Sequence, residues 1–172
     1  MADRLFWPSW FVAAVLAGVV AGFMLGHALI LGRFLDWMLA SGTPGLLTQT
    51  YAVFRGGAGR AGLDAYYAVA GLQVLSGLAF LLVALGARRR RLAAAVAAVC
   101  GAAWVVVHYA SGFGALEASV LRGTTEVTSE VRDRFVAWNA PIHFLHAATL
   151  LAALASLLSV PLSALRRGQA RV

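Results

Sequence analysis

Charged residues are scarce in this chain of 172 residues. They account for 12% of the sequence, whereas hydrophobic residues account for 61%. An ordinary soluble domain has about one quarter charged residues and a nearly even share of apolar ones. The chain therefore lacks the polar groups that would cover a globular protein in water, and its surplus apolar surface must face lipid.

Lysine is absent and cysteine occurs once. The 14 basic residues are all arginines, and most stand in short clusters beside apolar runs. Binding to nucleic acid needs a basic stripe on a water-exposed fold, so we expect no nucleic-acid partner despite the net charge of +7. The single cysteine, Cys100, lies inside an apolar run, which excludes a disulfide framework.

Four apolar runs approach or exceed the roughly 20 residues that are needed to cross a hydrocarbon layer of ~30 Å. They cover about residues 7–31, 66–87, 92–110 and 142–162. These runs predict an all-α fold, an integral membrane four-helix bundle that forms a single transmembrane domain over residues 1–172. The first run is too long for the core of a signal peptide, so we expect it to remain as a helix.

The arginines are distributed unevenly over the segments between these runs. One side carries eight arginines and one acid, Asp3, while the other carries six arginines and six acids. Because positive residues near helix ends stay in the cytoplasm, both termini are predicted to lie inside and the two longer loops outside, in the inner (cytoplasmic) membrane of a bacterium. The inner set is Arg4, Arg88, Arg89, Arg90, Arg91, Arg166, Arg167 and Arg171. The outer set is Arg33, Arg55, Arg60, Arg122, Arg132, Arg134, Asp36, Asp64, Glu117, Glu126, Glu130 and Asp133.

Both outer loops carry apolar or helix-forming segments. Phe34 to Leu39 is apolar with two aromatic residues, which predicts a short segment at the interface or folded over the mouth of the bundle. The composition of Glu117 to Trp138 predicts that the third and fourth helices extend beyond the membrane. Small residues recur every four positions from Ala14 to Gly26, a spacing that lets helices pack closely within one bundle or between copies of a homo-oligomer.

All four histidines fall in or at the edge of the apolar runs: His27, His108, His143 and His146. At a helical rise of about 1.5 Å per residue, all four lie at a similar depth in the outer leaflet. His143 and His146 are three residues apart and share one helical face. Ionisable groups inside a membrane usually point into the bundle, so we expect the four side chains to meet there.

Imidazole is a preferred ligand of zinc, copper and iron, and we favour a transition-metal site held by these four histidines. Copper or iron would suit oxidation, whereas zinc would point to hydrolysis. Three other interpretations remain open. The histidines could bind haem b with two axial imidazoles, form a proton relay or quinone pocket, or only tie helices together by hydrogen bonds.

Further residues complete the predicted site. Glu117 and Asp36 are candidates for additional ligands, with a solvated loop carboxylate as the alternative for each. Asn139, Tyr109 and Ser111 are candidate hydrogen-bond partners of the ligating imidazoles, since such rings commonly donate their second N–H to a neighbour. The predicted substrate pocket consists of Trp104, Trp138, Phe34 and Trp37.

The layout of four helices and three short segments resemble the anthrone oxygenase-like family of small membrane proteins. The segments are residues 21–27, Ala-Gly-Phe-Met-Leu-Gly-His, residues 49–51, Gln-Thr-Tyr, and residues 135–139, Phe-Val-Ala-Trp-Asn. The resemblance implies oxidation of a hydrophobic, often polycyclic phenolic substrate by dioxygen. Many members carry an arginine near the start of the last helix, where this chain has Pro141, Ile142 and His143.

The leading hypothesis is therefore a metal-dependent membrane oxidoreductase that uses dioxygen on a hydrophobic small molecule entering from the lipid bilayer. The first alternative is an electron-transfer subunit that carries haem or quinone within a larger membrane complex. The second alternative is a non-catalytic accessory subunit whose histidines hold helices together.

Overall fold

The computed structural model describes residues 2–41, 44–122 and 127–169, and every regular element in these ranges is a helix. The predicted all-α fold is therefore confirmed. Two of the charged residues on which the predicted orientation depends, Glu126 and Arg171, lie outside the described ranges.

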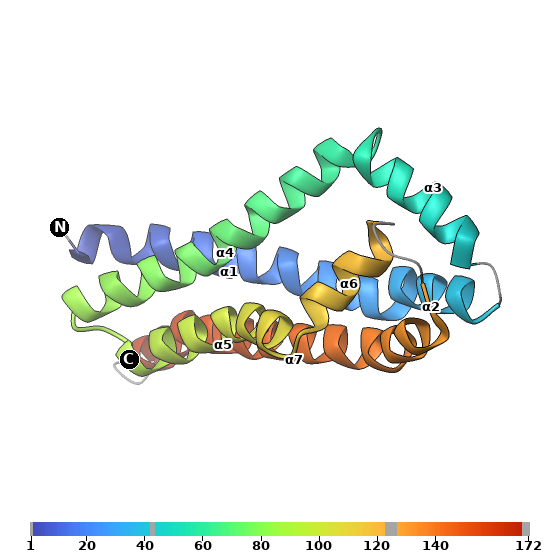
Figure 1. Ribbon diagram of the computed structural model, residues 1–172. Coiled ribbons are helices and arrows are strands. Elements are labelled where there is room, and N and C mark those ends of the chain that lie inside the picture. Colours follow the sequence, from blue (N-terminus) through green and yellow to red (C-terminus); the bar gives the residue numbers. More distant parts are fainter. Residues whose placement is uncertain (1, 42–43, 123–126, 170–172) are drawn as a thin grey trace. The chain divides into compact units, whose positions relative to one another are not determined.

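Four helices are long and apolar enough to cross a membrane (Figure 1): Ala2–Ala40, Arg60–Gly86, Arg91–Ala110 and Ser129–Ser163. The first consists of α1 (Ala2–Gly26), a π-helical stretch η1 (His27–Leu31) and α2 (Gly32–Ala40); the others are α4 (Arg60–Gly86), α5 (Arg91–Ala110) and most of α7 (Ser129–Gln169). Two shorter helices, α3 (Pro44–Gly56) and α6 (Phe113–Leu121), connect them. Four apolar helices of this length are the mark of a membrane protein.

The boundaries of the helices differ from the sequence prediction in two places. The first helix continues to Ala40, so the segment from Phe34 to Leu39 belongs to α2 and is not a separate interfacial piece. The third helix stops at Ala110 instead of extending beyond the membrane, because Gly112 adopts φ 76° and turns the chain before α6 begins. The fourth helix does extend in the predicted direction, since α7 begins at Ser129.

The chain divides into two compact units. Unit 1 comprises residues 1–21, 69–104 and 148–172, and unit 2 comprises residues 22–68 and 105–147. The core of unit 1 is built from aromatic, small and branched side chains, with the rings of Phe6 and Phe80 5.4 Å apart. Trp10 Nε1 donates to the Leu157 carbonyl at 2.8 Å, and this bond ties α1 to α7 within the unit.

The start of α1 and the arginine turn lie at the same end of unit 1. Arg89 Nη1 is 3.9 Å from Asp3 Oδ1, and the Arg89 guanidinium lies 5.1 Å from the centroid of the Phe6 ring. This proximity agrees with the prediction that the N-terminal segment and the turn share one side of the membrane.

The core of unit 2 joins the short helices to the start of α7. Its buried members are Leu35, Met38, Leu39, Leu47, Phe113, Val120, Leu121, Phe135 and Ile142. Helix α3 contacts both α2 and α6 (Figure 1). This packing fixes α6, and α6 carries Glu117.

Candidate metal site

All four histidines belong to unit 2, on three separate stretches of helix. His27 opens η1, His108 lies near the end of α5, and His143 and His146 lie on α7. A π-helical turn widens the backbone by one residue per turn and is common at functional sites. Here the π-helix begins at His27, which is the first residue of the cluster along the chain.

The structure brings the four imidazole rings together. The rings of His27 and His143 stack with centroids 3.8 Å apart and planes 22° apart. The ring of His146 lies 5.5 Å from those of His108 and His143. His27, His143 and His146 are buried, whereas His108 is partly exposed. The meeting of the histidines expected from sequence is thus present in unit 2.

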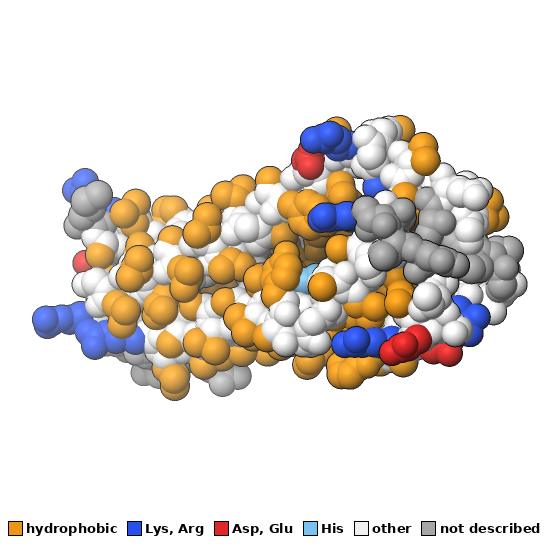
Figure 2. All heavy atoms as spheres, in the orientation of Figure 1, with side chains coloured by type: hydrophobic (Ala, Val, Ile, Leu, Met, Phe, Trp, Pro, Cys, Tyr) orange, Lys and Arg blue, Asp and Glu red, His pale blue; other side chains and the backbone are white. Residues whose placement is uncertain are grey.

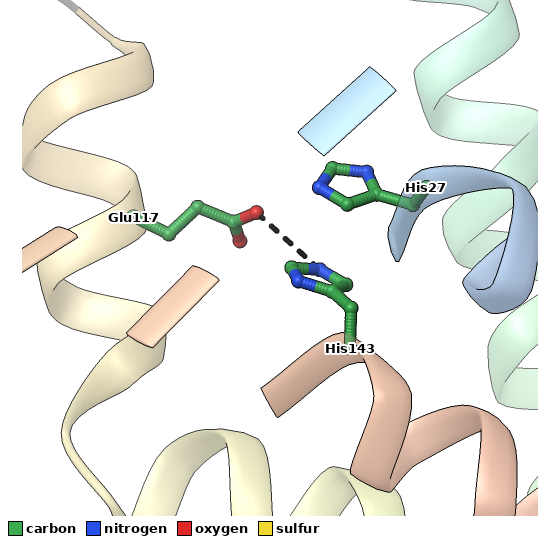
Figure 3. Close-up of side chains that lie close together, drawn as sticks. All are labelled: His27, Glu117 and His143. Carbon is green, nitrogen blue, oxygen red and sulfur yellow. Dashed lines mark ion pairs between the residues drawn. The ribbon is translucent and has the colours of Figure 1, made fainter. Parts of the chain in front are cut away.

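Glu117 reaches into this cluster from α6. Its Oε1 is 3.9 Å from His143 Nε2, and its Oε2 is 3.7 Å from His108 Nε2. Figure 3 shows the carboxylate directed toward the rings of His27 and His143. One ligand atom each from His27, Glu117 and His143 lies within 4.8 Å of the other two.

These three residues could hold a metal ion. Bonds of about 2.0–2.2 Å from nitrogen or oxygen to a metal keep neighbouring ligand atoms roughly 3 to 4 Å apart. The observed spacing is slightly wider than this range, so a bound ion would have to draw the three atoms closer together.

The electrostatics around Glu117 favour a cation. Burial raises the pKa of Glu117 to about 7, and the positive charge of Arg55 opposes that rise. A buried carboxylate needs a compensating charge or a proton, and the nearest groups in the cluster are imidazoles. Near neutral pH a proton and a metal ion therefore compete for the same carboxylate.

His27 contributes a second sign of an unmet partner. Its Nε2 is buried and has no hydrogen-bond partner within the described residues. Buried polar atoms in folded proteins are nearly always paired, so an orphan imidazole nitrogen beside a carboxylate calls for an explanation. A metal ion bound by His27, Glu117 and His143 would satisfy the nitrogen.

Asn139 organises the side of the cluster on α7. The carbonyl oxygen of Asn139 accepts a hydrogen bond from His143 Nδ1 at 2.8 Å. Because a carbonyl can only accept, Nδ1 carries the proton, and the lone pair of neutral His143 is then on Nε2, the atom nearest Glu117. Such a bond to the second ring nitrogen is the usual support of a ligating imidazole.

The side chain of Asn139 in turn holds Asp36. Its Nδ2 donates to Asp36 Oδ1 at 2.8 Å and to the Gly32 carbonyl at 3.0 Å, and both side chains are buried. Asp36 was predicted as an additional ligand. In the structure, Asp36 accepts a hydrogen bond from Asn139. Asp36 is not among the three residues whose ligand atoms lie close together.

Two glycines make room for the histidines. A Cβ on Gly32 would lie 2.9 Å from the His27 carbonyl oxygen and 3.1 Å from Asn139 Nδ2. A Cβ on Gly114 would lie 2.9 Å from His108 Nε2. The sequence analysis missed both residues. Their positions in the sequence carry no signal of the close contacts, which only the folded chain shows.

The remaining predicted site residues lie elsewhere. Phe34, Trp37 and Trp138 are at least half exposed, so they do not enter the buried cluster. The reason on α2 is helical phase, because Leu35, Asp36 and Leu39 take the buried face and leave the opposite face to the aromatic residues.

Three more predicted residues have other roles. Tyr109 is 70% exposed, with its ring edge-on to the His108 ring at 5.0 Å. Ser111 Oγ donates to the His108 carbonyl at 3.2 Å rather than to the ring. Trp104 belongs to unit 1, where its Nε1 donates to the buried amide oxygen of Gln73 at 3.0 Å.

No protein-family model, no curated protein and no solved structure matches this chain.

Proposed function

We propose that this protein is a membrane oxidoreductase with a transition metal bound by His27, Glu117 and His143. The observation that supports this most is the approach of three ligand atoms to within 4.8 Å from η1, α6 and α7. The unpaired Nε2 of His27 and the raised pKa of Glu117 also support the binding of a cation at this position.

The ligand set narrows the choice of metal. Two imidazoles and one carboxylate with open positions form the set of non-haem iron oxygenases, and zinc hydrolases use a similar one. We favour iron, since three protein ligands leave room for dioxygen and the resemblance to the anthrone oxygenase-like family implies an oxidation. The metal would supply the binding and activation of dioxygen.

The substrate in this proposal is the hydrophobic, often polycyclic phenolic molecule that the resemblance implies. His108 and Glu117 are the partly exposed members of the cluster, and Figure 2 shows a histidine side chain reaching the surface among hydrophobic ones. A lipophilic substrate would approach from that side, and His108 could pass protons to or from Glu117.

The ring geometry does not favour haem. A haem with two histidine ligands requires one imidazole on each face of the macrocycle. His27 and His143 stack directly at 3.8 Å, which leaves no space for a porphyrin between them. An electron-transfer subunit with these two residues as axial ligands is therefore the weaker candidate.

The proposal is tested on protein purified in detergent and reconstituted with iron(II), zinc or copper. We expect about one tightly held ion per chain, as in a mononuclear site. The variants His27→Gln, Glu117→Gln and His143→Gln should each weaken binding at least tenfold. Glu130→Gln, which removes an exposed carboxylate at the start of α7, is the matched control and should bind as the wild type does.

Elemental analysis and an optical spectrum give the readout. A wild-type protein that holds no ion after reconstitution with any of the three metals contradicts the proposal. A strong haem absorption band in the protein as isolated would favour the electron-transfer alternative instead.

A further inference from the structure

The net positive charge of the chain is confined to unit 1. Eight of the 14 arginines fall in residues 1–21, 69–104 and 148–172, together with one acid, Asp3. Unit 2 contains the other six arginines and six acids, so its formal charges balance. Unit 1 therefore has a large cationic excess that its own side chains cannot neutralise.

The arginine turn between α4 and α5 has an unusual backbone. Arg88 N donates to the Leu85 carbonyl at 3.2 Å and Arg89 N donates to the Ala84 carbonyl at 3.0 Å. This pair of bonds forms a Schellman motif at the end of the helix. In that motif the residue at the position of Arg88 has a left-handed backbone conformation and is usually glycine. Arg88 has φ 52° and Arg90 has φ 50°. Two arginines thus occupy positions where the backbone favours glycine.

Beside this turn lies a groove of about 650 Å³. Its polar wall is the run from Arg88 to Arg91, and its apolar wall consists of Phe6, Trp7, Leu92, Ala93 and Val160. Leu92 is 79% exposed and Trp7 is 41% exposed, although both are large apolar side chains. Figure 2 shows a cluster of arginine side chains next to hydrophobic ones.

We propose that this groove binds an anionic phospholipid, with the guanidinium groups on the headgroup phosphate and the start of an acyl chain along Trp7 and Leu92. Guanidinium groups form paired, charge-assisted hydrogen bonds with phosphate, and basic pockets at helix ends are known to take acidic headgroups. The turn also joins two helices that are long and apolar enough to cross a membrane, and the ends of such helices are expected at the level of the headgroups.

The apolar wall decides between a lipid and a free phosphate ion. A small anion would use the arginines but would gain nothing from exposed Trp7 and Leu92. Retention of arginines in the cytoplasm explains why the turn is positive. It does not explain a groove with one cationic and one aromatic wall, and a lipid matches both walls.

The test uses the full-length protein in a neutral detergent, with binding followed by native mass spectrometry. The probes are dihexanoyl phosphatidylglycerol and dihexanoyl phosphatidylcholine. We expect phosphatidylglycerol to bind at least about tenfold more tightly than phosphatidylcholine, because each arginine near an anionic lipid surface raises the affinity roughly fivefold. Equal binding of the two lipids would overturn the proposal.

The double variant Arg88→Gly with Arg90→Gly separates lipid binding from folding. Glycine suits both left-handed positions, so the variant should unfold at the same or a higher temperature than the wild type. Its affinity for phosphatidylglycerol should nevertheless fall about tenfold or more. Arg132→Gln with Arg134→Gln, which removes the same charge from unit 2, is the control and should leave lipid binding unchanged. Unchanged binding in the glycine variant would refute the assignment.

Two further arms identify the source of the phosphate. Inorganic phosphate in tenfold excess should not displace phosphatidylglycerol, and Trp7→Ala should weaken lipid binding several-fold. Displacement by phosphate, or full affinity in Trp7→Ala, would show a site for small anions and would exclude the lipid.

Discussion

The imidazole rings of His27 and His143 stack with centroids 3.8 Å apart, although one ring comes from η1 and the other from α7. Two imidazolium cations at this distance inside a buried cluster would repel each other strongly, so the stack requires at least one neutral ring. Neutral imidazoles offer lone pairs to a cation. The stack and the adjacent carboxylate of Glu117 therefore form a group that could hold a metal ion.

Metal binding should weaken as the pH falls through 7. The pKa of Glu117 is raised to about 7 by burial, so the carboxylate is increasingly protonated below that value and is then a poor ligand. We expect the dissociation constant for iron(II) or zinc to rise about tenfold between pH 8 and pH 6 from this one proton. Binding isotherms at the two pH values measure the change.

Glu117→Gln provides the comparison for that pH dependence. The variant keeps the titratable and charged groups that interact with the carboxylate, which are His27, His108, His143, Tyr51, Tyr66 and Arg55. It should bind metal more weakly at both pH values and show a smaller change between them. An equal pH dependence in the two proteins would mean that Glu117 is not the group that titrates.

The stability of the metal-free protein should respond to pH in the opposite sense. The pKa of Glu117 lies above its ordinary value of 4.5 in the folded state, so the folded protein holds a proton that the unfolded chain releases between pH 4.5 and about 7. The contribution of Glu117 to stability is therefore lost as the pH rises through this window.

Thermal unfolding of wild type and Glu117→Gln at pH 5 and pH 7.5 isolates this effect. The histidines titrate in both proteins, so the difference between the two melting temperatures reports Glu117. We expect the wild type to lose stability relative to the variant as the pH is raised, and a constant difference would contradict the burial of an ionisable carboxylate here.

The side chain of Asn139 should support folding. Asn139→Ala removes the hydrogen bond that Asn139 Nδ2 donates to the buried carboxylate of Asp36, and this loss should destabilise the protein by about 1–3 kcal/mol. Asp36→Asn should cost less when combined with Asn139→Ala than when the two losses are simply added, because both act on one hydrogen bond. Chemical denaturation of the four proteins gives the double-mutant cycle, and strict additivity would show that the bond contributes nothing.

The four membrane helices and the meeting of the histidines could be predicted from sequence because both depend on strong signals. Long apolar runs define the spans, and an ionisable residue in such a run has few places to point. Residues such as His27 and His146 therefore indicated the cluster before any geometry was known.

Other features depend on conformations that sequence patterns do not encode. The π-helix at His27 adds a residue to one turn and changes the phase of everything after it, including which side of α2 is buried. Trp37 is 62% exposed, whereas the sequence analysis placed it in a pocket. Helix α3 was also missed, because its amphipathic pattern is short and lies in a segment with several glycines and one proline.

Gly32→Ala should disturb the site by steric contact alone. The added Cβ would lie 2.9 Å from the His27 carbonyl and 3.1 Å from Asn139 Nδ2, and neither the backbone of η1 nor the held side chain of Asn139 can move freely. We expect a loss of about 1–3 kcal/mol and weaker metal binding. Gly22→Ala is the control, since a Cβ there meets nothing within 4 Å and alanine favours the helix by up to about 1 kcal/mol. If the two variants unfold alike, Gly32 is not needed for close packing.

The predicted orientation places the histidine cluster near the outer leaflet, and cysteine labelling tests it. In a Cys100→Ser background, Ser41→Cys lies after α2 and Asp3→Cys lies at the start of α1, and both positions are exposed. A membrane-impermeant maleimide should label Ser41→Cys in intact cells and Asp3→Cys only after permeabilisation, because the arginine excess of unit 1 holds its end in the cytoplasm. The reverse pattern would place the histidine cluster near the cytoplasmic leaflet and remove the arginine turn from the inner surface. That result would not change the geometry of His27, Glu117 and His143, so the proposed metal site and the predicted orientation are tested independently.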